Sequence, residues 1–169
     1  MGDADENRHE NENEDDGGGE SDGGHDGGDL YDGEAFDLSS THIHLGLGSR
    51  AIPLPDFQWT PEYLGAMTER FAGDGPEGRL VMMGRSEARG DSWERHPAGQ
   101  EVVVLLSGSI DLVQREPDGR ERRIPMAPGQ AVINPVGVWH TADVHAPADA
   151  LFITPGLGTE HEPRRPPSR

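Results

Sequence analysis

Two stretches of the sequence decide the fold: WERHPAGQE at residues 93–101 and GQAVINPVGVWH at residues 129–140. The first stretch places Glu94, His96 and Glu101 around a Pro-Ala-Gly turn. Side chains two apart on a strand share a face, so Glu94 and His96 are predicted to point the same way. Three metal-ligating side chains in eight residues therefore make this segment a candidate site.

The residues that follow predict an apolar setting for these groups. Glu101 opens the run EVVVLLSG, in which Val103 and Leu105 alternate onto its face. The second stretch ends on His140, the next imidazole along the chain after His96, and Ala142 shares its face. The pattern predicts that both segments turn their polar groups into one dry interior.

The rest of the chain from residue 38 on is typical of an all-β domain. Short apolar runs are separated by Gly and Pro, namely THIHLGL, RLVMMGR, EVVVLLSG, SIDLVQR, RERRIPM, QAVINP, GVWHTADV and ALFITP. Regularly spaced short strands indicate a sandwich or barrel of mostly antiparallel neighbours. One helix is predicted in TPEYLGAMTERFAG (60–73), with Thr60 as N-cap, Pro61 in the first turn and Gly73 as the stop. We interpret its apolar face as packing.

The two stretches resemble the paired motifs of the cupin superfamily. In the first motif the spacing matches at Glu94, His96, Glu101 and Gly108, with glutamate in place of the usual first histidine. In the second, the matching residues are Gly129, Pro135, Gly137 and His140, while Val144 stands where the family has asparagine. The resemblance covers roughly residues 79 to 155.

The resemblance implies a fold and a division of the chain. The fold is a cupin double-stranded β-helix, a jelly-roll barrel, with one short helix before it and a disordered N-terminal tail. We expect a disordered acidic, Gly-rich tail over 1–37, an N-terminal strand and helix packing on the barrel over 38–78, the barrel over 79–158, and a disordered Arg/Pro-rich C-terminus over 159–169. Small cupins are often dimers, which suggests a homodimer.

The resemblance also implies a metal site formed by Glu94, His96, Glu101 and His140. The chain has no cysteine, so any metal must be held by imidazole and oxygen, and Mn²⁺, Fe²⁺, Ni²⁺ or Zn²⁺ would suit such donors. The alternative is that Glu94 is a rim residue beside a metal-free pocket.

Composition excludes several function classes. Residues 1–37 hold 15 of the 32 acidic residues and one of the 14 basic residues, so 14 of the 18 net negative charges lie there. An anionic chain without a basic patch is a poor partner for nucleic acid or an anionic membrane. All basic residues are arginine, which excludes a lysine Schiff base and the P-loop lysine. The acidic N-terminus and the lack of a long apolar run predict a cytoplasmic protein.

Other histidines and aromatic residues receive structural interpretations. His42 and His44 are interpreted as polar or interfacial, with Ile43, Leu45 and Leu47 buried on the opposite face. His145 is predicted to lie on the surface. Trp93 and Trp139 are predicted to face away from the ligands and to pack between the barrel wall and the N-terminal segment.

Two functions agree with these observations. The first is a metal-dependent enzyme, a dioxygenase or isomerase that acts on a small organic molecule. The second is a small-molecule-binding or sensing cupin that needs the apolar barrel mouth but no metal. The sequence singles out no additional acid or base, and the catalytic residues stay unassigned.

Overall fold

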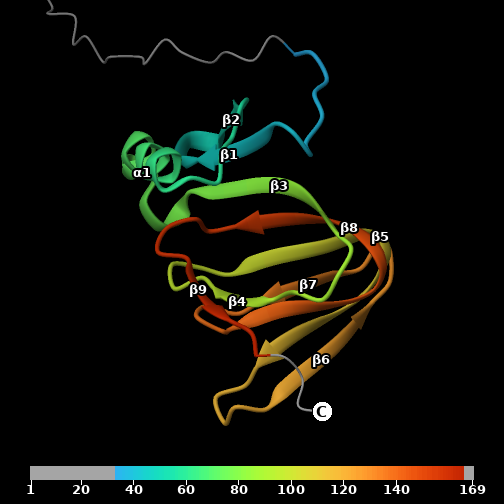
Figure 1. Cartoon of the computed structure of the whole chain (residues 1–169). Coiled ribbons are helices and arrows are strands. Elements are labelled where there is room, and N and C mark those ends of the chain that lie inside the picture. Colours follow the sequence, from blue (N-terminus) through green and yellow to red (C-terminus); the bar gives the residue numbers. More distant parts are fainter. Residues whose placement is uncertain (1–32, 166–169) are drawn as a thin grey trace, which may run out of the picture.

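Nine antiparallel strands form one curled sheet within residues 33–165, the part of the chain that the computed structural model describes (Figure 1). The strands are β1 (His42–Gly46), β2 (Arg50–Leu54), β3 (Arg79–Ser86), β4 (Ser92–Arg95), β5 (Glu101–Arg115), β6 (Glu121–Met126), β7 (Ala131–Asn134), β8 (His140–Thr154) and β9 (Glu160–Pro163). The helices are α1 (Pro61–Arg70) and the 3₁₀ segments η1 (Leu47–Ser49) and η2 (Ala72–Glu77). No helix in this range is long and apolar enough to cross a membrane. The predicted all-β barrel with one short helix before it is confirmed.

Two long strands, β5 and β8, hold the barrel together. β5 pairs with β6, β7 and β8, whereas β8 pairs with β3, β4 and β5. Each long strand joins two runs that the sequence analysis treated separately. The β5–β8 register shifts repeatedly between Leu105 and Ile110, around Gly108. Bulges of this kind bend strands, so each long strand serves two regions of the curled sheet.

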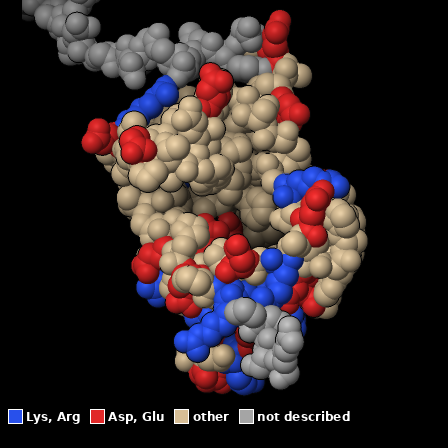
Figure 2. Space-filling view, viewed as in Figure 1, with Lys and Arg blue, Asp and Glu red and all other residues tan. Residues whose placement is uncertain are grey.

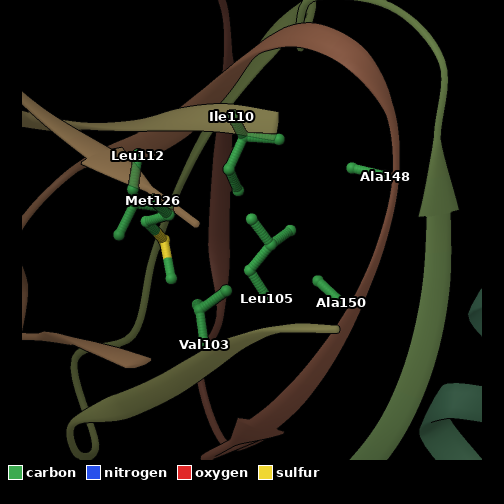
Figure 3. Packing of buried hydrophobic residues seen from close by; sticks show 7 residues of the cluster. All are labelled: Val103, Leu105, Ile110, Leu112, Met126, Ala148 and Ala150. Atoms are coloured by element: carbon green, nitrogen blue, oxygen red, sulfur yellow. The ribbon is translucent and has the colours of Figure 1, made fainter. Parts of the chain in front are cut away.

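The barrel core lies inside the curl. Figure 3 shows the buried cluster converging there, namely Val103, Leu105, Ile110, Leu112, Met126, Ala148 and Ala150. Before the bulge the buried residues of β5 are the odd-numbered Glu101, Val103 and Leu105, and after it they include Ile110 and Leu112. The irregular register lets both halves of β5 face the same core, because one extra residue exchanges the two faces of a strand.

Helix α1 begins as predicted. Thr60 Oγ1 accepts a hydrogen bond from the Tyr63 amide at 3.2 Å, and Pro61 occupies the first turn. The helix ends at Arg70, before the Gly73 that the sequence predicted as its stop, and the 3₁₀ segment η2 follows. No residue of α1 is fully buried, so the helix is not packed into the core.

The prediction for His42 and His44 on β1 differs from the structure. β1 pairs with β2 and β3, which extends the sheet beyond the barrel. His42 and His44 are buried, at 8% and 7% exposure, whereas Leu47 is 50% exposed, so the predicted assignment of faces is wrong. The physical reason is that Phe57 and Phe71 cover the histidine face of β1, with ring centroids 4.6 Å from His42 and 3.7 Å from His44.

The C-terminal segment is ordered where disorder was predicted. The prediction for 159–169 is wrong for residues 160–163, which form β9 against β4. Arg164 is buried, bonds to Asp143 at 2.6 Å and lies over the Trp93 ring. The Arg- and Pro-rich composition suggested a solvated tail, but the carboxylate of Asp143 and the ring of Trp93 hold the Arg164 side chain.

Three other predictions can be placed. Trp93 packs beneath Arg115 and Arg164 near β9, so the prediction that it packs against the N-terminal segment is wrong. His145 lies on the surface beside Asp111, at 3.2 Å, as predicted. The predicted acidic tail falls mostly on residues 1–32, outside the described residues, and residues 33–37 are exposed.

The bend at Gly108 generates a stability prediction. Gly108 has a φ of +82°, and a Cβ there would lie 2.2 Å from the Pro147 carbonyl oxygen. Gly119 has a φ of +84° with open space around it. We expect Gly119→Ala to cost about 1–2 kcal/mol of backbone strain, and Gly108→Ala to cost about 1–3 kcal/mol more from overpacking. Urea unfolding measures both, and equal losses would contradict the role assigned to Gly108.

Candidate metal centre

Three of the four predicted ligands form one cluster. Glu94 lies on β4 directly opposite His140 at the start of β8, and His96 follows the end of β4. One ligand atom from each of Glu94, His96 and His140 lies within 4.8 Å of the others. The antiparallel pairing of β4 with β8 therefore brings together residues more than 40 positions apart in the sequence.

The two imidazoles of the cluster are oriented by their Nδ1 atoms. Nδ1 of His140 donates to the Val138 carbonyl at 3.0 Å, and Nδ1 of His96 lies 3.0 Å from Thr159 Oγ1. A carbonyl oxygen only accepts, so neutral His140 carries its proton on Nδ1 and a lone pair on Nε2. The Nε2 atoms of both rings are buried, and within residues 33–165 neither makes a hydrogen bond. This orientation is the one that metal-ligating histidines adopt.

Glu101, the fourth predicted ligand, lies beside the Nε2 atoms of the two rings. Its carboxylate oxygens lie 3.4 Å from His96 Nε2 and 2.9 Å from His140 Nε2, the latter outside the direction of a hydrogen bond. Thr154 Oγ1 donates to Oε1 at 2.7 Å, and Asn134 Nδ2 donates to Oε2 at 2.9 Å. Each oxygen accepts one hydrogen bond, and a carboxylate offers about four acceptor positions, so capacity for a further ligand is left.

The electrostatics of this group favour an ionised carboxylate. Burial of Glu101 acts to raise its pKa, but its contacts with His140, His96 and Thr154 outweigh burial, and the net pKa lies below its ordinary value. Burial likewise acts to lower the pKa of His140, but the adjacent Glu101 raises it overall. A cation at this position is therefore favoured.

Glu94 is more exposed to solvent than the two histidines of the cluster. Its side chain is 35% exposed, and Oε1 lies 3.8 Å from His96 Nε2 and 3.4 Å from Nε2 of His161 on β9. The register of β4 and β9 places His161 directly opposite Glu94. The sequence analysis missed His161 because it predicted disorder there. The alternating EHEP segment was the available strand signal, although it is very short.

A cavity of about 570 Å³ opens beside the cluster, between the barrel and the N-terminal elements. Figure 2 shows a hollow on this face with mostly uncharged residues around it. The cluster side of the wall includes Glu94, Thr154, Thr159 and His161. The apolar part of the wall includes Phe57, Trp59, Leu64, Met67, Phe71 and Met82. The apolar face of α1, which the sequence analysis interpreted as packing, thus lines a cavity.

Both motifs lie where the resemblance placed them: the ligand positions of the first meet His140 of the second on the inner face of a curled antiparallel sheet. The chain therefore has the β-barrel fold that the resemblance to cupins implies. The glutamate at position 94 departs from the motif, and the N-terminal elements form the other wall of the cavity.

Comparison with known proteins gave similarities to solved structures alone. No family model matches the sequence, and no curated protein aligns with it significantly. Among solved structures, the chain is similar to hydroquinone 1,2-dioxygenase from Sphingomonas sp. TTNP3 with 4-hydroxybenzoate bound (20% identity, TM-score 0.40), with 45% of this chain and 58% of that chain covered.

Two other solved structures illustrate the range of similar proteins. One is a cupin-2 domain protein from Shewanella frigidimarina (19% identity, TM-score 0.38), with 51% of this chain and 71% of that chain covered. The other is the Bacillus subtilis oxalate decarboxylase with Mn(II) centres (17% identity, TM-score 0.44), with 57% of this chain and 26% of that chain covered. The chain thus spans less than two thirds of the hydroquinone dioxygenase and of the decarboxylase.

The support of Glu101 generates a second stability prediction. Thr154→Val keeps the shape of the side chain but removes a hydrogen bond to a buried, ionised carboxylate, so we expect a loss of about 1.5–3 kcal/mol in the free energy of unfolding. The matched control is Thr68→Val on α1, where the hydroxyl bonds to the Leu64 carbonyl in an exposed position; its effect should stay within about 0.5 kcal/mol. Equal effects in urea unfolding would show that Glu101 does not depend on Thr154.

Proposed function

We propose that this protein is a small cupin that binds a divalent transition metal through His96, His140, Glu94 and Glu101, and that it is a metal-dependent enzyme acting on a small organic molecule in the adjacent cavity. One observation carries the proposal. Two buried imidazoles are fixed through Nδ1, and both leave Nε2 without a hydrogen bond within the described range. A buried nitrogen without a partner costs about 1–3 kcal/mol, and a metal ion would satisfy both at once.

The donor set fits such an ion. Two imidazoles and two carboxylates are donors that suit Mn²⁺, Fe²⁺, Ni²⁺ or Zn²⁺. Two carboxylates also neutralise the charge of a divalent ion, which lowers the cost of placing it in a site whose other ligands are buried. Binding would release any proton held by His140, because a ligating imidazole must be neutral.

The residues around the site have separate tasks in this proposal. A bound ion would supply Lewis-acid polarisation or redox chemistry at an open coordination position. Thr159 and the Val138 carbonyl orient the two imidazoles, while Thr154 and Asn134 hold Glu101. Glu94 lies on the cavity wall, so a molecule in the cavity reaches the cluster from this side.

The cavity suits a small organic molecule. Its volume of about 570 Å³ falls within the roughly 300–1,000 Å³ typical of small-molecule sites, and such sites are mostly apolar with a few polar groups. A second candidate function follows from the cavity alone, because most of its wall lies outside the metal cluster. In that case the protein binds or senses a small molecule without metal and without catalysis.

Metal content tests the first function. Full-length protein purified without a His-tag should contain stoichiometric Mn, Fe, Ni or Zn by elemental analysis, and His140→Ala should lose it. Glu94→Gln, which removes an anionic donor, should weaken binding by about 10–100-fold. His145→Ala removes a surface imidazole, and the acidic tail is present in every variant, so adventitious binding would not follow this pattern.

A protein that binds no metal would contradict the proposal. If the wild-type protein carries none of these metals, and none of them raises its melting temperature, the metal proposal is wrong, since a ligand that binds the native state must stabilise it. The metal-free binding function would then be the better account of the cavity.

A further inference from the structure

His44, a histidine outside the metal cluster, lies on the same face of the sheet as Thr154. His44 on β1 lies opposite Leu80 on β3, and Leu80 lies opposite Thr154 on β8. Thr154 in turn bonds to Glu101. Directly opposite residues of antiparallel strands point to the same side, so His44 and Thr154 share a face, and both line the cavity. Two strand spacings of about 4.8 Å separate His44 from Thr154, or roughly 10 Å.

His44 is held in place by a buried carboxylate. Its Nε2 lies 2.8 Å from Oδ2 of Asp74, which is 3% exposed. Asp74 Oδ1 also accepts from the Leu47 amide at 3.0 Å and from Arg50 at 2.6 Å, and its hydrogen bond with His44 lowers the pKa of Asp74. An ionised carboxylate can only accept, so Nε2 of His44 carries a proton. In the neutral ring, Nδ1 is therefore the basic atom.

Asp74 has structural contacts besides the one with His44. Asp74 already fixes the turn after β1 through Leu47 and Arg50. The backbone approaches so closely that a Cβ at Gly46 would lie 2.4 Å from Asp74 Oδ2. His44 in turn stacks on Phe71 and borders the cavity, so the imidazole that Asp74 holds is placed next to any molecule bound there.

The surroundings of His44 indicate the kind of molecule that would use it. Aromatic rings of Phe57, Trp59 and Phe71 line this part of the cavity, which suits a flat apolar body. Asp74, which contacts the ring, also pairs with Arg50. The cavity wall carries Glu94 and His161 on the side of the metal cluster, and also Arg79, which donates to the Pro76 and Gly78 carbonyls. No carboxylate pairs with Arg79 within residues 33–165, so positive charge at this end favours an anion.

We propose that the cavity binds a phenol or enol and that Nδ1 of His44 accepts the proton of its hydroxyl. The O–H bond breaks and an N–H bond forms on the imidazole, so that an oxyanion and an imidazolium result, and Asp74 balances the imidazolium. The proton returns to the bound molecule or passes to solvent, and no oxidant or reductant is needed. The proposal deepens the proposed function by naming the class of molecule that the cavity takes.

The test uses 4-nitrophenol, whose anion absorbs visible light, and its methyl ether 4-nitroanisole, which has no proton to give. Full-length protein freed of metal by chelation should bind 4-nitrophenol about tenfold or more tightly than the ether. The bound probe should also contain more anion than the free probe at the same pH. His44→Gln, whose amide can still donate to Asp74, should lose both differences, and His145→Gln should keep them.

Each other result overturns the proposal. It is wrong if the wild-type protein binds neither probe, if it shows no enrichment of the anion, or if His44→Gln behaves like the wild type. Should the Gln variant fail to fold, Asp74→Asn serves instead and must reduce the anion fraction. An anion signal that appears only after Zn²⁺ is added would assign the deprotonation of the probe to the metal. That result would leave the proposed function intact and would refute the role proposed for His44.

Discussion

The buried carboxylate of Glu101 is the constraint on which the rest of the structure depends. An ionised group can be buried only if hydrogen bonds and charges compensate for the lost water. Here the compensation comes from Asn134 on β7, Thr154 on β8 and the two imidazoles. A shift of one residue in the register of β5 would turn Glu101 outward and its apolar neighbours with it. The register of β5 in the barrel therefore also fixes the position of the site.

The sequence predicted the part of the site that short-range patterns specify. Glu94 is on β4 and His96 directly follows the end of that strand, and Glu101 comes after a short turn, so local spacing alone places them close together. His140 required a pairing of β4 with β8, which the resemblance to cupins supplied. The prediction therefore succeeded for the barrel strands. The structure also brings Glu94, His96 and His140 together, while their role as metal ligands stays a prediction.

The missed features depend on contacts between distant segments. The burial of His44 depends on Asp74, 30 residues later, and on a ring from the end of α1, and no local pattern encodes either contact. The ordering of β9 depends on pairing with β4, although its composition resembles that of a solvated tail. The apolar face of α1 was recognised, but the sequence could not show whether it covers a core or a cavity.

Together these contacts give the cavity two different polar ends. One end carries Glu94 and His161 beside the metal cluster, and the other carries His44 from the N-terminal strand. The sealed core of the barrel (Figure 3) lies apart from both and serves stability. The N-terminal elements thus complete a site that the barrel begins, which is why neither motif alone indicates the ligand.

Anomalous diffraction from crystals soaked in Mn²⁺ or Zn²⁺ tests the central claim most directly. The account predicts one strong peak at about 2.0–2.2 Å from Nε2 of both His96 and His140, with a Glu94 or Glu101 oxygen completing the set. A metal found only at surface groups such as His145, with the two buried Nε2 atoms still unligated, would contradict it.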